Sequence, residues 1–205
     1  MPCPEDQLAV SATCGQCLAS RNLSRRGVLK SALRLGLGLQ FVSHITYAAE
    51  APQKARPQAG DVFVFSLGDR QGQPVTLQDL PLGGPPIVAY PMDAGTQIVR
   101  NGSRLNRVLL VRLATKDLTA QTRTTAAEGI VAYSAICPHT GCDVAGWQAD
   151  TKHFVCPCHA STFDPQDRAK VVSGPAPRSL AVLPLRITDG KLTVAGPFAG
   201  RVGFN

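Results

Sequence analysis

Short apolar segments separated by turn residues follow one another along the chain from residue 61 onward. From Leu183 to Ile187 every second residue is leucine or isoleucine, which is the period expected for a half-buried strand. Asp189-Gly190 then predicts a tight hairpin turn. Extended segments of this kind cover residues 61–67, 86–90, 107–113, 129–136, 152–156, 180–187 and 191–195. Because no segment after residue 50 keeps a helical stripe for three turns, the pattern predicts an all-β, antiparallel fold.

The first fifty residues follow a different pattern, with a basic segment ahead of an apolar one. Residues 24–30 read SRRGVLK and resemble the twin-arginine export signal, with Val28 where phenylalanine is usual. Residues 35–49 contain no Lys, Arg, Asp or Glu, but these 15 residues are fewer than the roughly 20 that a membrane-spanning helix needs. We expect an export signal, with an ordinary secretory signal or an uncleaved membrane anchor through residues 29–49 as alternatives.

The chain divides into a leader, a linker and one folded domain. Residues 50–60 read EAPQKARPQAG and lack apolar periodicity, which is typical of a linker. We therefore expect a twin-arginine-type signal or anchor in residues 1–51, a linker in residues 52–60 and a single domain in residues 61–205. Since twin-arginine export carries folded proteins, this arrangement predicts a periplasmic protein whose cofactor is inserted before export.

Composition and charge narrow the classes of function. The 19 glycines, the 16 prolines and the low aromatic content of 5% fit a loop-rich β-protein rather than one with long helices. The sequence has a net charge of +7 but no run of five like charges, so nucleic-acid binding is not expected. The arginines expected to form a solvated face, with partner docking as the alternative, are Arg100, Arg104, Arg107 and Arg112.

Four of the seven cysteines gather in two short segments, together with two of the four histidines. The first segment, residues 137–142, reads CPHTGC, and the second, residues 156–161, reads CPCHAS. Each follows a predicted strand at the start of a loop, where a rigid scaffold can present ligands. The other three cysteines, Cys3, Cys14 and Cys17, lie in the leader and are assigned no function.

Three kinds of site are compatible with these segments. A structural zinc site normally spaces its first ligand pair more widely than Cys137-x-His139, and it would leave two cysteines without a role. Two plain disulfides suit an exported protein but leave both histidines unexplained. A 2Fe-2S centre with two Cys on one iron and two His on the other takes four of the six residues as ligands and leaves Cys142 and Cys158 as a matched pair, one in each segment. This kind of site is favoured. A zinc-stabilised, non-redox module remains the remote alternative.

The two segments together resemble the Rieske iron–sulfur family. The family pattern Cys-x-His-x-Gly-Cys followed by Cys-x-Cys-His-x-Ser is met at every position. The resemblance implies a Rieske-type antiparallel β-sandwich, with a small cluster-binding subdomain inserted between strands at residues 129–178. It also implies a disulfide between Cys142 and Cys158. The implied ligands of one 2Fe-2S Rieske cluster are Cys137, His139, Cys156 and His159.

The resemblance also implies which residues surround and tune the cluster. Residues 173–178, SGPAPR, resemble the proline-rich loop that covers it and include Pro175. Ser161 matches the serine that donates a hydrogen bond to cluster sulfur, and Gly141 matches the glycine of the first segment. Phe163 stands where quinol-oxidising members usually carry a tyrosine. This departure counts against quinol oxidation and predicts a reduction potential below the top of the Rieske range of roughly −150 to +300 mV.

The function implied is electron transfer within an exported oxidoreductase. Residues 161–165 (STFDP) and 130–134 (IVAYS) are similar to the small subunit of the arsenite oxidase type. This implies single-electron transfer between a larger catalytic subunit, with the molybdenum type favoured, and a cytochrome-type acceptor. The alternative is the iron–sulfur subunit of a cytochrome bc-type quinol complex. Since the sequence has no second cofactor site or substrate-binding motif, we expect a subunit rather than an enzyme acting alone.

Overall fold

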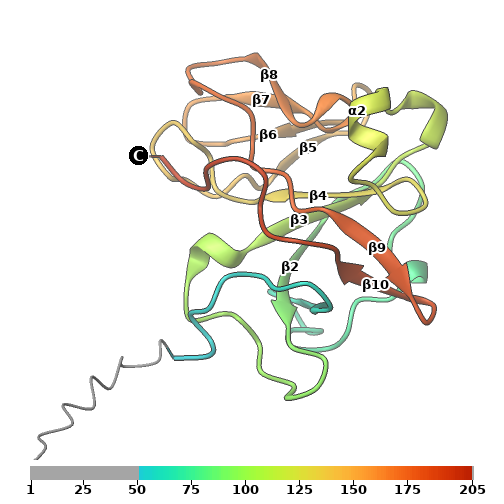
Figure 1. Ribbon diagram of the computed structural model, residues 1–205. Helices are drawn as coiled ribbons and strands as arrows, with labels where there is room; N and C mark the ends of the chain where they lie inside the picture. Colours follow the sequence, from blue (N-terminus) through green and yellow to red (C-terminus); the bar gives the residue numbers. More distant parts are fainter. Residues whose placement is uncertain (1–50, 205) are drawn as a thin grey trace, which may run out of the picture. The chain divides into compact units, whose positions relative to one another are not determined.

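The computed structural model describes residues 51–204, which fold into short antiparallel strands joined by turns (Figure 1). The single α-helix of this part, α2, covers only Ala120–Arg123. The predicted all-β fold class is therefore confirmed. The predicted export signal, the alternative anchor and the three leader cysteines lie outside the described residues and stay predictions. Within residues 51–204, no helix is long and apolar enough to span a membrane.

Four of the predicted segments form the first sheet, in the order β1-β2-β3-β4. Its strands are β1 (Val62–Phe65), β2 (Ile87–Met92), β3 (Val108–Arg112) and β4 (Ile130–Ser134). β3 and β4 are buried along nearly their whole length, and their pairing places Leu109 opposite Tyr133. β4 leads directly into the first cysteine–histidine segment.

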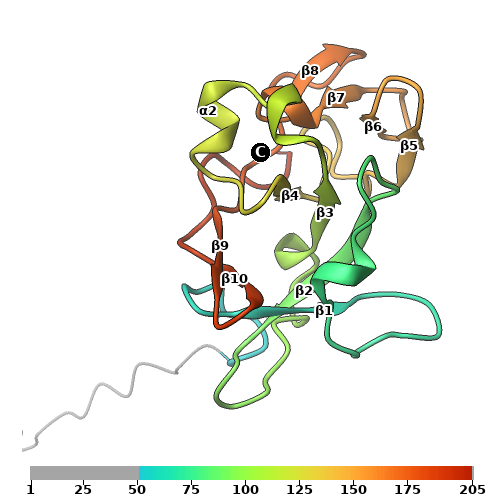
Figure 2. The ribbon, with the colours of Figure 1, turned by 90° about the vertical axis from the view of Figure 1, so that its right-hand side faces the viewer.

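A two-stranded hairpin lies beside the first sheet. β9 (Leu185–Thr188) and β10 (Lys191–Val194) pair around Asp189 and Gly190. The φ angles of these two residues are 51° and 72°, the positive values that the predicted turn requires. Figure 2 shows β10 next to β1, and the two strands are in contact.

Backbone hydrogen bonds close the first sheet and the hairpin into a barrel-like body. The Gly60 amide donates to the Val194 carbonyl (2.9 Å), so β10 continues the sheet beyond β1. At the opposite edge, the Ser134 amide donates to the Ala181 carbonyl (2.8 Å), so β4 lies beside the segment that precedes β9. Residues far apart in the sequence thereby protect both edges of the sheet.

A second four-stranded sheet is inserted between β4 and β9. In the order β5-β6-β7-β8, its strands are Gly146–Gln148, His153–Val155, Thr162–Asp164 and Lys170–Ser173. Figures 1 and 2 show this sheet stacked at one end of the barrel-like body, next to β4. The two cysteine–histidine segments lie in its connections, one between β4 and β5 and the other between β6 and β7. The expected inserted subdomain is therefore present.

Two apolar cores join these parts. In β3 and β4, odd-numbered residues such as Tyr133 face one core and even-numbered residues face the other. The first core lies between the first and second sheets and contains Tyr133 and Phe154. The second lies between the first sheet and the hairpin and contains Phe63 and Leu183. Because both faces of β4 are buried, the start of the first cysteine–histidine segment is rigidly placed.

The pattern of the sequence did not predict every element. β5, β7 and β8 were missed because they are three or four residues long and lie among loop residues with no apolar alternation. The predicted segment 180–187 is interrupted at Pro184, which has no amide hydrogen, so β9 begins at Leu185. Short 3-10 turns cover Leu77–Asp79, Arg104–Asn106, Thr115–Asp117 and Pro165–Asp167.

Candidate metal centre

The first segment, residues 137–142, forms a tight loop after β4 and is called the first loop below. The Cys137 amide donates to the Cys142 carbonyl (2.8 Å), and the Gly141 amide donates to the Cys137 carbonyl (3.0 Å). Gly141 has a φ of +79°, a conformation that favours glycine. The loop therefore turns back on itself and holds Cys137 and His139 on a fixed backbone.

The second segment, residues 156–161, forms a similar loop after β6 and is called the second loop. The Cys156 amide donates to the Ser161 carbonyl (2.9 Å), which brings the two ends of the loop together. The chain reverses at Ala160, whose φ is 55°. Cys156 is buried under this turn, whereas His159 lies at the surface.

The two loops meet at their cysteines. Cys142 and Cys158 form a disulfide that joins one loop to the other, as expected. The Sγ of Cys156 lies within 4.8 Å of both sulfurs of that disulfide. Cys137 and Cys156 are free thiols, each 1% exposed. One pair of cysteines is therefore cross-linked, while the other pair is buried and available as ligands.

The two imidazole rings also come together. The ring centroids of His139 and His159 are 4.7 Å apart, with the planes at 86°. His139 is half-buried, and its Nδ1 is buried without a hydrogen-bond partner among the described residues. Because buried polar atoms almost always have a partner, this nitrogen points to a ligand that the chain does not itself supply.

This set of donors fits a 2Fe-2S cluster of mixed ligation, which requires two thiolates and two imidazoles. Burial raises the pKa of the Cys137 thiol, and a hydrogen bond from the backbone of His139 opposes that effect. The neighbouring thiol of Cys156 raises this pKa further. Since metals bind the thiolate, binding must displace the proton from this buried thiol.

The proline-rich residues 173–178 cover the second loop. A Cβ on Gly174 would lie 2.4 Å from the Cα of Ser161, so only glycine allows the two backbones to approach this closely. The Ala176 amide donates to the Ser161 hydroxyl oxygen (3.1 Å), and Ser161 is fully buried. Pro175 lies at the surface between these two contacts. The segment therefore shields the buried side of the second loop from water.

Phe163 lies in β7 with its side chain fully buried. It belongs to the same apolar core as Cys137 and Cys156, and strand pairing places it opposite Phe154. An aromatic ring without a hydroxyl group at this position packs against its neighbours but donates no hydrogen bond to the buried thiols.

Two arginines hold the first loop against the barrel-like body. Arg104 donates to the Gly141 carbonyl (2.8 Å) and to Asp143 (2.9 Å), and Arg107 donates to Asp143 (2.8 Å). Arg100 is itself buried in an ion pair. The expected solvated face is therefore wrong for Arg100 and Arg107. Their carboxylate partners lie some forty residues away in the chain, so no local sequence pattern could reveal the pairing.

The C-terminal segment also reaches the first loop, which the sequence analysis did not anticipate. A Cβ on Gly141 would lie 2.6 Å from the Cδ1 of Phe204, so the phenyl ring packs directly on this glycine. Arg178, the last residue of the proline-rich segment, donates to the Gly203 carbonyl. The C-terminal residues thus contact both the first loop and the proline-rich segment.

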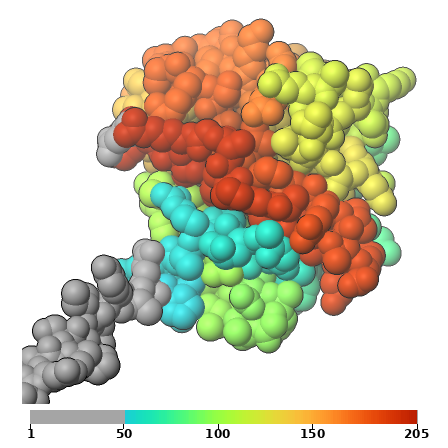
Figure 3. Space-filling view, viewed as in Figure 1, coloured from blue at the N-terminus to red at the C-terminus, as the bar shows by residue number. Residues whose placement is uncertain are grey.

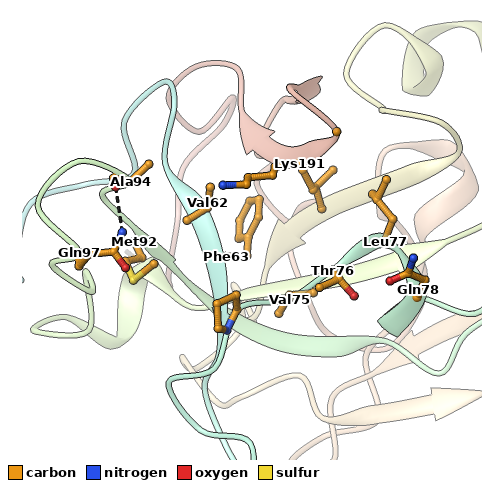
Figure 4. A pocket seen from close by; sticks show the side chains of 13 residues that line it. Val62, Phe63, Val75, Thr76, Leu77, Gln78, Met92, Ala94, Gln97 and Lys191 are labelled. Carbon is orange, nitrogen blue, oxygen red and sulfur yellow. Dashed lines mark hydrogen bonds between the residues drawn. The ribbon is translucent and has the colours of Figure 1, made fainter.

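A cavity of about 460 Å³ lies elsewhere, beside β1 and β10 (Figure 4). Its walls include Phe63, Val75 and Met92, and Lys191 contributes its side chain. No residue of the first or second loop lines it, so this cavity is not part of the candidate metal centre.

Comparison with known sequences agrees with this geometry. Residues 99–184 match the Rieske [2Fe-2S] domain family. The chain is 48% identical over 77 residues to the cytochrome bc1 complex Rieske iron-sulfur subunit of Streptomyces lividans, which is 37% of this chain and 45% of that protein. It is 46% identical over 76 residues to a putative respiratory nitrate reductase Rieske subunit of Haloferax mediterranei, which is 37% of this chain and 34% of that protein.

Among solved structures, the ferredoxin of carbazole 1,9a-dioxygenase from Nocardioides aromaticivorans is similar with a TM-score of 0.41 and 18% identity. This match covers 66% of the present chain and 97% of the ferredoxin.

The all-β domain holds two buried thiols and two imidazoles in two neighbouring loops, which is the donor set that an iron–sulfur domain of mixed ligation requires. Residues 99–184 are, more specifically, a Rieske domain, and such a domain binds a 2Fe-2S cluster. The matched parts of the two curated relatives are less than half of their lengths, at 45% and 34%.

Cys142→Ser should loosen the two loops without removing either free thiol. In the chain-entropy model a disulfide that closes a loop of this size stabilises by roughly 3 kcal/mol. We expect a lower Tm and a shifted reduction potential in the purified, cluster-loaded chain, measured by thermal denaturation and voltammetry. Cys158→Ser should behave alike because it breaks the same bond. An unchanged Tm and potential in both variants would mean that other contacts hold the loops together.

Proposed function

We propose that Cys137 and Cys156 ligate one iron of a 2Fe-2S cluster and that His139 and His159 ligate the other. The observation that carries this proposal is that the same two loops hold a pair of histidines, whose rings lie 4.7 Å apart, and the two free thiols. The unpartnered Nδ1 of His139 is the atom that would bind iron, which leaves Nε2 of the same ring to hold a proton. When bound, the cluster accepts and releases one electron.

The surrounding residues would keep that electron transfer reversible. The disulfide between Cys142 and Cys158 holds the two loops at a fixed separation, so little rearrangement accompanies a change of redox state. The proline-rich segment and the buried Ser161 exclude water from the inner side of the site. His159 is exposed and His139 is half-buried, so the electron would pass between the cluster and a docked protein through His139 or His159.

We propose that residues 61–205 act as the electron-transfer domain of an exported redox complex, with the leader directing it to the periplasm by the twin-arginine route. A larger catalytic subunit, of the molybdenum type, would donate or accept the electron, and a cytochrome would be the other partner. Within residues 51–204 the group of His, Cys, Asp and Glu side chains close enough to hold a metal is Cys142, Cys156 and Cys158, which lie in the same two loops. A relative named as a nitrate reductase Rieske subunit supports a partner of this class.

The second candidate is the iron–sulfur subunit of a cytochrome bc-type quinol complex. The name of the Streptomyces lividans relative, at 48% identity, supports it. The buried Phe163 speaks against it, because this position then lacks the hydroxyl that quinol-oxidising members usually have.

The test uses the full chain purified with its cluster. We expect a rhombic EPR signal after reduction with dithionite, reversible one-electron voltammetry, and no turnover with arsenite, sulfite or quinol. Co-purification with a molybdenum subunit would support the first candidate, whereas co-purification with cytochrome b would support the second. Rapid oxidation of any of these substrates by the chain alone would overturn both.

A further inference from the structure

Three segments distant in the sequence meet beside the first loop. They are residues 51–60, residues 100–107 and residues 197–204. The Asn106 side-chain amide donates to the Ala55 carbonyl (2.8 Å), which ties the first segment to the second. The third segment reaches the second at Gly203, where a Cβ would lie 3.4 Å from Leu105. Figure 3 shows the first segment, at the blue end of the scale, next to the red C-terminal residues.

These three segments carry only positive charge. They contain six Lys and Arg residues and no Asp or Glu. Arg100, Arg104 and Arg107 are paired with carboxylates from other parts of the fold. Lys54, Arg56 and Arg201 are exposed, and no carboxylate within residues 51–204 forms an ion pair with any of the three. We call the three paired residues the inner arginines and the three exposed residues the outer charges. The fold therefore neutralises the inner arginines and leaves the outer charges facing solvent.

Two of the outer charges line one groove. Arg56 and Arg201 stand on the walls of a depression of about 410 Å³, to which Pro197 and Phe198 contribute apolar surface. Guanidinium groups bind carboxylates through two parallel hydrogen bonds, and they do so at lower desolvation cost than an ammonium group. A groove with two such groups and an apolar wall suits a surface that presents Asp or Glu side chains beside apolar ones.

The groove is connected to the first loop through residues 104–105. Arg56 donates to the Leu105 carbonyl (3.5 Å), and Arg104, the preceding residue, donates to the Gly141 carbonyl of the first loop (2.8 Å). From the other side, Phe204 packs on Gly141. A protein bound in the groove would thus lie alongside the loop that carries His139.

We propose that the groove between Arg56 and Arg201, with Lys54 at its side, is the docking surface for a carboxylate-rich face of a redox partner protein. This inference rests on the proposed electron-transfer function and adds the site and the chemistry of docking. Charges placed at the rim of such an interface mainly raise the association rate and select the partner. The neutralised inner arginines hold the groove in shape, while the outer residues attract the partner.

The test measures attraction of carboxylates and anions to this surface in the cluster-loaded full chain. The first probe is a fluorescein-labelled poly-L-glutamate, whose binding is followed by fluorescence anisotropy. The second is ferricyanide, which takes one electron from the reduced cluster and becomes ferrocyanide, followed by stopped-flow absorbance. The charge-reversed variant is Arg56→Glu with Arg201→Glu. The control is Lys191→Glu, which reverses one exposed charge on the hairpin, beside the 460 Å³ cavity.

We expect the double variant to bind poly-L-glutamate about ten-fold more weakly and to react with ferricyanide about three- to ten-fold more slowly at low ionic strength. Both differences should vanish in 1 M salt, where the Debye length is about 3 Å. The cationic oxidant tris(phenanthroline)cobalt(III) should instead react faster with the variant. Lys191→Glu should change each value less than two-fold.

Two results would overturn the proposal. Because the double variant reverses two charges and Lys191→Glu reverses one, an equal logarithmic change per reversed charge in the two would assign the attraction to net charge alone. Weaker poly-L-glutamate binding with an unchanged ferricyanide rate would place the groove too far from the cluster to serve electron transfer. Failure of the proposed function looks different, because the unaltered chain would then lack the rhombic EPR signal before any variant is made.

Discussion

Replacing His159 by alanine should remove the 2Fe-2S cluster while the fold remains intact. The imidazole is exposed, so its loss costs little packing, yet it is one of only four proposed ligands. We expect the iron content of the purified protein to fall close to zero and the rhombic EPR signal of the reduced protein to disappear. Circular dichroism should still report the strand content of the unaltered chain.

The control for this variant is His153→Ala. His153 begins β6 and is also partly accessible, but it belongs to neither loop. It should therefore keep the iron and the EPR signal. Cys156→Ser should lose the cluster as His159→Ala does, although its buried position adds a packing change. A full rhombic signal in His159→Ala would show that the proposed set of ligands is wrong, and zinc without labile sulfide in the unaltered chain would overturn the choice of cofactor.

Most of the candidate site could be proposed from the sequence, because candidate metal ligands are recognised by their local spacing. Cys137 and His139 lie within one tight turn, and Cys156 and His159 within another, so each pair is placed by a few backbone hydrogen bonds. The hairpin at Asp189 was predictable for the same reason, because two residues with positive φ determine the turn. Features of this kind can be predicted without knowing the rest of the fold.

The supports of the site were not predictable, since they join distant parts of the chain. Of the four strands in the sheet that carries the second loop, β5, β7 and β8 are three or four residues long and lie among loop residues, so no apolar period could be recognised in them. Arg104 reaches Gly141 from 37 residues away, and Phe204 reaches the same glycine from the C-terminal end. Such contacts arise from the closure of the sheets, and the sequence shows only isolated arginines and a terminal phenylalanine.

Arg100→Met should destabilise the domain strongly, because it would leave a buried carboxylate without its cation. Arg100 donates two hydrogen bonds to Asp61, at 2.5 and 2.8 Å, and the two side chains are only 7% and 2% exposed. Removal of one partner from a buried ion pair typically costs about 3–5 kcal/mol. We expect a loss of this size in the free energy of unfolding, measured by urea denaturation of the cluster-loaded chain.

Two further variants distinguish the stability lost with the buried ion pair from the stability lost by removing any arginine. Arg70→Met breaks a partly exposed pair with Asp79 and should cost far less, because the one charge that remains, the Asp79 carboxylate, is still reached by water and accepts hydrogen bonds from Thr76. Adding Asp61→Asn to Arg100→Met removes the unpaired charge, so the double variant should be more stable than Arg100→Met alone. Since Arg100 begins the segment that brings Arg104 to the first loop, the single variant should also lose its cluster faster on warming. Equal losses in Arg100→Met and Arg70→Met would mean that the buried pair contributes no more than a surface contact.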